Sequence, residues 1–150
     1  MFSKFGAAAA VLILFATPAL ADSTCGYQPI APSMPSPASI KSASVAGGLA
    51  SLQDAVSQIK HWQGALKTYR DCLNAEVAQN KRNIAQADPS KKADRISDMK
   101  DAITANTKAY DSSVDEEEHV VNEFHASEAA YCMRSDIDKS ICPGAHPKGG

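Results

Sequence analysis

The sequence lacks the short motifs that mark the common catalytic and cofactor sites. It contains no C-x-x-C or C-x-x-C-H spacing, no G-x-S-x-G, no glycine-rich phosphate loop and no H-E-x-x-H. Its four histidines include no pair at i, i+4, the spacing with which a helix holds a metal ion. We therefore expect no enzymatic activity, no cofactor and no metal site.

Neither charge sign predominates, and no apolar run is long enough to cross a membrane. The 15 basic and 17 acidic residues give a net charge of −2, which argues against the basic surface of a nucleic-acid-binding protein. The main apolar run, residues 6–15, is about half as long as the roughly 20 residues that a spanning helix needs. We expect no nucleic-acid partner and no stable membrane insertion of the mature chain.

Residues 1–21 have the layout of a secretory signal peptide. Lys4 precedes the apolar run, and the small-residue tripeptide Ala19-Leu20-Ala21 follows it. This order predicts cleavage after Ala21 and a periplasmic or secreted protein. The four cysteines all lie beyond the cleavage site: Cys25, Cys72, Cys132 and Cys142. An even number of cysteines in an exported chain favours two disulfides over a metal site.

Residues 22–47 are rich in proline, serine and alanine, a composition that favours an extended backbone over a helix. Two serines are candidate N-caps for the first helix: Ser36, which precedes a proline, and Ser44, which precedes paired glycines. Because each glycine destabilises a helix interior by about 1 kcal/mol, we predict the helix only from Gly48. The sequence leaves its start open between residues 37 and 48.

Residues 48–135 carry apolar side chains at alternating steps of three and four, the period of an amphipathic helix. Asp88 is a suitable N-cap and Pro89 suits the first helical position, so a second helix is predicted to begin there. The predicted fold is all-α: a long antiparallel two-helix hairpin, coiled-coil-like, that turns near residues 88–89. The second helix is predicted to be continuous, with a capping box at residues 111–113 as an alternative break. Residues 136–150 form a short irregular tail.

The middle of the first helix both interrupts the apolar seam and widens it. Gln63 and Arg70 stand at seam positions, and Trp62 and Tyr69 lie beside them. Two helices cannot cover so wide a stripe. Either the Pro-rich segment or a second chain, in a homodimeric four-helix bundle, is therefore expected to pack there. The candidate docking surface comprises Trp62, Gln63, Leu66, Tyr69, Arg70 and Leu73.

The hairpin also ranks the possible cysteine pairings. Cys72 and Cys132 would lie roughly 39 Å apart along the helices, whereas a disulfide requires Cα atoms within about 7 Å. The preferred pairs are Cys25 with Cys72 and Cys132 with Cys142. In the alternative pairing, Cys25 is bonded at the end of the molecule that holds Cys132 and Cys142, and Cys72 forms a disulfide between two chains.

These features predict a non-enzymatic exported protein that acts by protein–protein interaction in the cell envelope, as a structural, adaptor or chaperone-like component. The architecture resembles small periplasmic helical hairpin proteins that sense envelope stress or act as chaperones, but their L-T-x-x-Q repeats are missing here. Two alternatives stay open. One is a small-ligand or metal-binding bundle that uses the acidic residues 115–125, and the other is an inhibitor of an envelope hydrolase.

Overall fold

The computed structural model describes residues 24–142 of the chain. Its helical elements are, in chain order, α1 (Pro37–Ser42), α2 (Val45–Ala85), α3 (Ala93–Cys132) and the short 3-10 helix η1 (Lys139–Ile141). The described residues form no strand, so the prediction of an all-helical fold is confirmed. Helix η1 falls in the segment predicted to be irregular. The predicted signal peptide, its cleavage site and residues 143–150 lie outside the described residues.

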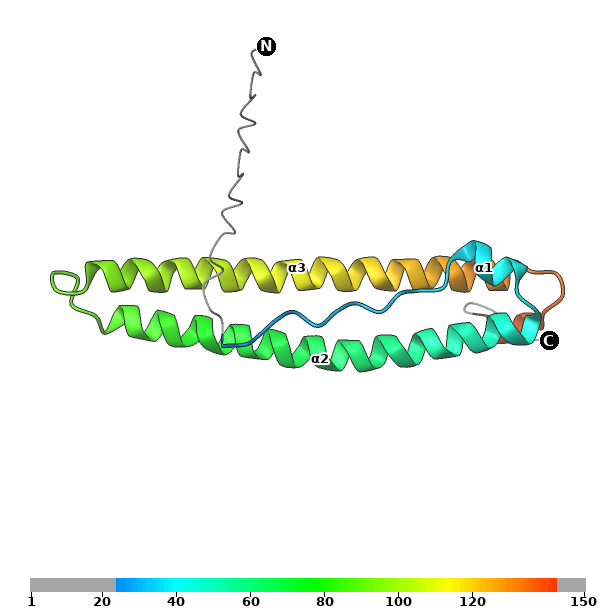
Figure 1. Cartoon of the computed structure of the whole chain (residues 1–150), viewed down its shortest axis with the longest axis horizontal. Helices are drawn as coiled ribbons and strands as arrows, with labels where there is room; N and C mark the ends of the chain where they lie inside the picture. The colour runs from blue at the N-terminus through cyan, green and yellow to red at the C-terminus, as the bar shows by residue number, and fades with distance from the viewer. Residues whose placement is uncertain (1–23, 143–150) are drawn as a thin grey trace, which may run out of the picture.

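Helices α2 and α3, of 41 and 40 residues, lie side by side along nearly their whole lengths (Figure 1). Their contacts join early residues of one helix to late residues of the other. Val45 contacts Tyr131, and farther along Gln63 contacts Glu117. The two helices therefore run in opposite directions. The predicted pair of long packed helices is confirmed, and α3 continues through residues 111–113 without a break.

The helical region begins earlier than predicted, because both candidate N-caps are used. The hydroxyl of Ser36 accepts a hydrogen bond from the N–H of Ser39 and starts α1. The hydroxyl of Ser44 accepts one from the N–H of Gly47 and starts α2 at Val45. The extended backbone predicted for 22–47 therefore ends at Ser36, and a short helix and the first turn of α2 follow it.

Gly48 lies inside α2, although its poor helix propensity led to the prediction that the helix begins there. The ring of Tyr131, from the far end of α3, packs directly against it. A Cβ at Gly48 would lie 3.2 Å from two carbons of that ring. The missing side chain thus allows α3 to approach closely, and this packing outweighs the helix cost of about 1 kcal/mol.

The turn between the long helices spans residues 86–92, but α3 begins at Ala93 and not at Pro89. Asp88 closes the turn itself: its carboxylate accepts hydrogen bonds from the N–H and the hydroxyl of Ser90. Its carbonyl accepts the N–H groups of Lys91 and Lys92. Because Asp88 is used in this way, α3 starts without a side-chain cap.

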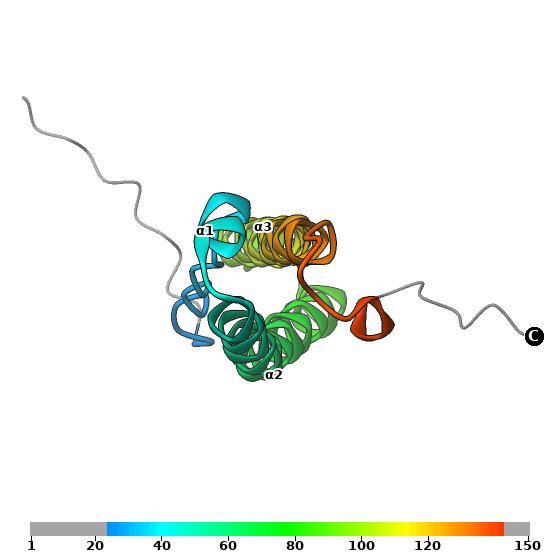
Figure 2. The ribbon, with the colours of Figure 1, turned by 90° about the vertical axis from the view of Figure 1, so that its right-hand side faces the viewer.

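The core lies toward the end of the helix pair that is remote from this turn. There α1 forms a third layer, packed mainly on α3 (Figure 2). Two clusters of buried apolar side chains follow one another along the pair. The first consists of Ile40, Leu52, Ala130 and Tyr131, and the second of Ile59, Trp62, Leu66 and Val120.

Candidate functional site

Residues 24–35, called the strap here, run as an extended chain along α2 and α3 toward α1 (Figure 1). From Tyr27 to Pro35, the exposure of the strap residues repeats every three residues. Tyr27, Ile30 and Ser33 are exposed, whereas the two residues after each of them are partly buried. Three residues per turn is the period of a polyproline II helix. One partly buried row of that helix consists of Pro29, Pro32 and Pro35.

In the proline-rich part of the strap, the main chain is held through its carbonyls, because the prolines have no N–H to donate. The indole Nε1 of Trp62 donates to the carbonyl of Pro29 over 3.1 Å. The hydroxyl of Ser127 donates to the carbonyl of Pro35. Trp62 is 4% exposed and Ser127 is fully buried. A buried donor without a partner costs about 1–3 kcal/mol, so the strap satisfies groups that would otherwise destabilise the core.

The strap also supplies apolar side chains to the second core cluster. Ala31 and Met34 pack against the buried residues of that cluster, and so does the partly buried Phe124 of α3. The surface under the strap is called the strap-binding face here. It comprises Ile59, Trp62, Leu66, Val120, Phe124 and Ser127.

A disulfide and several polar contacts fix the first end of the strap. Cys25 is bonded to Cys72, with 5.6 Å between the Cα atoms. Glu76 accepts hydrogen bonds from both the N–H and the hydroxyl of Thr24, the former over 2.8 Å. The other carboxylate oxygen of Glu76 accepts the amide of Asn106 over 2.7 Å. This end of the strap is therefore tied to α2 directly and to α3 through Glu76.

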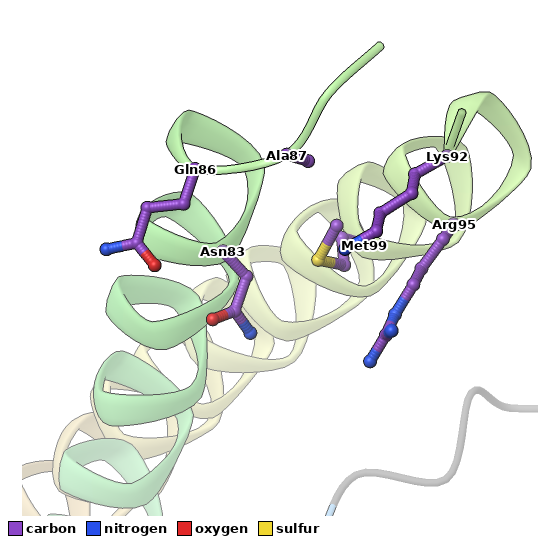
Figure 3. A pocket seen from close by; sticks show the side chains of 6 residues that line it. All are labelled: Asn83, Gln86, Ala87, Lys92, Arg95 and Met99. Carbon is purple, nitrogen blue, oxygen red and sulfur yellow. The ribbon is translucent and has the colours of Figure 1, made fainter. Parts of the chain in front are cut away.

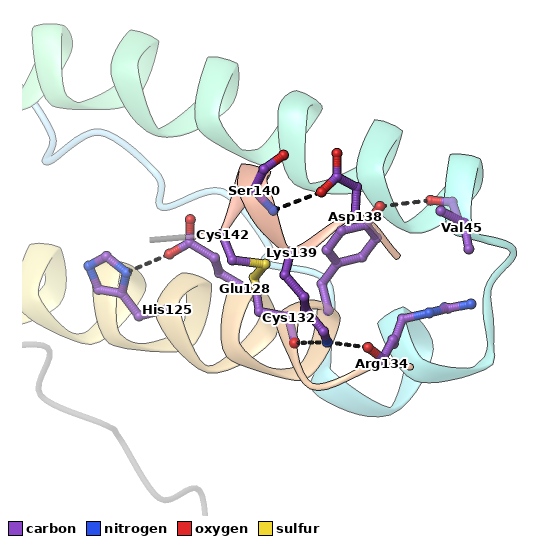
Figure 4. The surroundings of a disulfide bond; sticks show 10 residues. Val45, His125, Glu128, Cys132, Arg134, Asp138, Lys139, Ser140 and Cys142 are labelled. Carbon is purple, nitrogen blue, oxygen red and sulfur yellow. Dashed lines mark hydrogen bonds and ion pairs between the residues drawn. A yellow bond between two sulfur atoms is a disulfide. The ribbon is translucent and has the colours of Figure 1, made fainter. Parts of the chain in front are cut away.

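The second disulfide joins Cys132 to Cys142, with 5.8 Å between the Cα atoms, and folds η1 back on the end of α3 (Figure 4). Lys139 donates to the carbonyls of Cys132 and Arg134 at that end. The guanidinium of Arg134 in turn donates to the carbonyl of Ile40 over 2.9 Å, which holds α1. Both disulfides are the pairs that the hairpin geometry predicts, and none of the four cysteines is free for a bridge between chains.

The polar break in the apolar seam is satisfied within the helix pair. Arg70 donates from Nε to the buried Ser113 hydroxyl over 2.7 Å, and from Nη2 to the Ser113 carbonyl over 2.6 Å. Glu117 accepts Nη1 of Arg70 over 2.5 Å and the amide of Gln63 over 2.7 Å. Burial raises the pKa of Glu117, but the hydrogen bonds from Arg70 and Gln63 outweigh that effect and hold the pKa below its usual 4.5. These contacts suit only one register of α2 against α3.

The residues predicted as a docking surface therefore face inward. Buried among them are Trp62, Leu66 and Leu73, and partly buried are Gln63, Tyr69 and Arg70. Of the two coverings left open by the sequence, the structure shows the chain's own Pro-rich segment. The strap and α3 pack against this set, which is one of the two coverings expected, and a second chain at this position stays a prediction.

Two exposed apolar side chains of the strap are absent from the predicted docking surface. Tyr27 is 95% exposed and Ile30 is 94% exposed. The signal in the sequence was the proline at every third position from 29 to 35. That spacing sets the polyproline II period, which places Tyr27 and Ile30 on one outward row.

The acidic stretch 115–125 does not gather a metal-ligand set in the structure. Glu116 accepts the amide of Gln28 of the strap, and Glu117 holds Arg70. His119 lies 3.3 Å from Glu123 in an exposed pair. Within residues 24–142, the only group of three potential ligands is Cys25, Cys72 and Glu76. Two of these are joined in a disulfide, so their thiolates are not available to a metal.

Several small pockets open on the described residues, and two of them are lined by residues of both long helices. One, of about 240 Å³, lies beside the turn, and its lining includes Asn83 of α2, Gln86 and Lys92 of the turn, and Arg95 of α3 (Figure 3). The other, of about 160 Å³, lies next to the second disulfide and is lined mainly by apolar side chains, among them Leu52 and Phe124. Neither contains a set of residues that points to a catalytic step.

No protein-family model, curated protein or solved structure matches the chain. Between residues 24 and 142, no helix is both long and apolar enough to cross a membrane.

Proposed function

We propose that the chain is a non-enzymatic exported protein that acts by protein–protein interaction in the bacterial envelope, as a helical-hairpin structural, adaptor or chaperone-like component. The observation that carries this proposal is the outward row of the strap, where Tyr27 and Ile30 are almost fully exposed. The two disulfides fit an oxidising compartment. The predicted signal peptide would direct the chain there.

The outward row has the properties of a binding surface. Tyrosine is enriched among the residues that dominate binding energy in protein interfaces. The strap is fixed at its first end by the Cys25–Cys72 disulfide and continues into α1 at the other. Little conformational entropy is therefore lost when a partner binds. Tyr27 and Ile30 are one polyproline II turn apart, about 9 Å, so the partner needs two apolar pockets at that spacing.

Site-specific crosslinking in the native envelope tests this proposal. A photoreactive residue in place of Ile30 should yield adducts with envelope proteins, which mass spectrometry identifies. The same residue at the exposed position 65 of α2 is the matched control. Tyr27→Ala should remove the adducts formed from position 30. Identical adducts from positions 30 and 65, or none from position 30, would contradict the proposal.

The identity of the adducts separates the narrower hypotheses. A single envelope hydrolase would favour the inhibitor hypothesis, and many unfolded clients would favour a chaperone-like role. A second copy of this chain would favour the homodimer, which stays a prediction. Sedimentation of the purified chain at micromolar concentration measures the homodimer directly.

A further inference from the structure

We propose that the strap-binding face is a peptide site, and that the strap is its built-in ligand, held in place by the Cys25–Cys72 disulfide. Once that disulfide is reduced, the face accepts an extended, proline-containing segment of another protein. The inference adds a second surface to the proposed function and names the class of its partner. It rests on the proposed function only because it assumes that the chain acts by binding other proteins. Its test uses purified protein. It can therefore fail while the crosslinking experiment succeeds, and the reverse also holds.

The face recognises main-chain groups that any extended chain presents. Trp62 and Ser127 donate to the carbonyls of Pro29 and Pro35. These two carbonyls are separated by two turns of polyproline II helix, about 19 Å. Another peptide in the same conformation offers carbonyls at the same spacing. A polyproline II ligand is also ordered before it binds, which is why proline-rich segments are common ligands of aromatic-lined surfaces.

The side chains that the face contacts define which peptides fit. Ala31 and Met34 pack on the second core cluster, and the proline row is partly buried beside them. Tyr27, Ile30 and Ser33 point away from the face and are exposed. A matching segment therefore has prolines at every third position, with a small and then a longer apolar residue directly before the second and third prolines. Its outward row is free to vary.

The disulfide decides whether the face is accessible. Apart from this bond, the contacts near the first end of the strap include hydrogen bonds from Thr24 to Glu76 and from Gln28 to Glu116. Such polar contacts near the surface are weak compared with a covalent bond. The other end of the strap continues into α1 and stays attached. Opening the disulfide therefore converts a closed loop into a segment tethered at one end only, which can leave the face.

The opening step is an exchange with a dithiol reductant. One reductant thiolate attacks a sulfur of the Cys25–Cys72 bond, forms a mixed disulfide and releases the other cysteine as a thiolate. The second reductant thiol then displaces the remaining cysteine, and the reductant leaves as its own disulfide. The cysteine pair gains two electrons and takes up two protons. Both cysteines are partly exposed, so a reductant can reach them.

The experiment uses the chain's only tryptophan, Trp62, as the reporter of the face. The oxidised chain and its Cys25→Ser/Cys72→Ser variant are titrated with a synthetic peptide of residues 26–36, and indole fluorescence and the indole N–H resonance are recorded. The released strap competes as a tethered ligand at an effective concentration in the millimolar range. Saturable binding to the variant is therefore expected in that range, at least about tenfold tighter than binding to the oxidised chain.

Two altered peptides test the specificity. One carries alanine in place of Tyr27, Ile30 and Ser33 and should bind like the parent peptide. The other carries serine in place of Ala31 and Met34 and should bind at least about tenfold more weakly, because it loses the apolar contacts. In the double-serine variant, Trp62→Phe keeps an aromatic ring but removes the donor to the carbonyl. It should weaken binding severalfold, as followed by peptide fluorescence anisotropy.

Three results would overturn the proposal. They are equal binding of all three peptides, no saturable binding by the variant, and a strap-exchanged dimer of the variant that takes up no peptide. If the double-serine variant does not fold, the wild-type chain is titrated with a dithiol. Trp62 emission should then move to longer wavelength as the Cys25–Cys72 bond is reduced, and added peptide should reverse the change. An unchanged emission would overturn the proposal equally.

Discussion

The two halves of the helix pair carry the same apolar period but bury it to different extents. Within residues 24–142, the buried apolar side chains all lie in the half of the molecule that is remote from the turn. They belong to α1, to α2 no later than Leu73, and to α3 from Val120 onward. Nearer the turn, corresponding seam residues such as Val77, Ile84 and Ile96 are only partly buried. The strap and α1 cover the half that is remote from the turn, and they do not cover the half near the turn.

The comparison shows that helix periodicity alone does not determine burial here. Two helices meet along one line, so a seam side chain contacts its partner on one side and remains open to water on the other. A third layer closes that open side. In this chain a proline-rich strap without regular backbone hydrogen bonds supplies it, together with the short α1.

Removal of the Cys25–Cys72 disulfide, which holds the strap, should cause the largest loss in the free energy of unfolding. Cys25→Ser/Cys72→Ser opens a loop with a sequence separation of 47, which corresponds to about 4 kcal/mol in the chain-entropy model. The matched variant Cys132→Ser/Cys142→Ser opens a shorter loop, with a sequence separation of 10. Loss of this disulfide should cost about 3 kcal/mol. Urea unfolding of both variants measures the difference. A larger loss at the second bridge would contradict the stabilising role of the strap.

Matched truncations in the two halves should differ next most strongly. Ile59→Ala, at a position that is 8% exposed under the strap, should destabilise the fold by about 3 kcal/mol. Ile96→Ala, at a partly exposed position near the turn, should cost about 1 kcal/mol, because less apolar surface is lost. Thermal or urea unfolding tests this. Equal losses would mean that the third layer does not matter to burial.

Loss of the polar contact at the middle of the pair should have a smaller effect. Arg70→Met removes the donor to the Ser113 hydroxyl and one of the two donors to the Glu117 carboxylate, the other being the Gln63 amide, and should cost about 2 kcal/mol. Lys67→Met is the control, since Lys67 pairs with Asp71 on the exposed face of α2. It should leave the unfolding midpoint unchanged. If Arg70→Met also leaves the midpoint unchanged, this contact does not stabilise the boundary between the two halves.

The smallest expected effect is a difference in the pH dependence of stability between the wild type and Glu117→Gln. The folded-state pKa of Glu117 lies below the usual 4.5. Its contribution is therefore fully present above about pH 4.5 and is lost as the pH falls through the folded-state value. Between pH 5 and the acid transition, the melting temperature of the wild type should fall more steeply than that of Glu117→Gln. Parallel curves for the two proteins would contradict this assignment.

The parts of the fold that depend on local patterns could be predicted from the sequence. The spacing of apolar residues in steps of three and four predicted the long helices. Ser36 and Ser44 are N-caps whose hydrogen-bond partners lie only three residues away. The cysteine pairs followed from distances along a helix. Asp88 led to a wrong start for α3, because one aspartate suits both a helix cap and a turn, and here the turn wins.

The parts that depend on distant contacts could not be predicted. Gly48 is tolerated in α2 because Tyr131, far along the chain, packs against it. Trp62 was predicted to need a cover, but its pattern was equally compatible with a second chain. Only the placement of Pro29 against its indole shows which cover is used. The three-residue spacing of the prolines held the missing information about which side chains of the strap face outward.

The two disulfides also determine how the chain would respond to a mechanical load. Tension applied at the two ends of the chain would pass from Cys25 directly to Cys72, and later from Cys132 directly to Cys142. The loops that these bonds close would carry no tension, and they include the strap, α1 and the first part of α2. Stretching could draw out only the segment between Cys72 and Cys132, in addition to the two ends. The extensible part of the molecule is therefore centred on the turn, where the packing has only two layers.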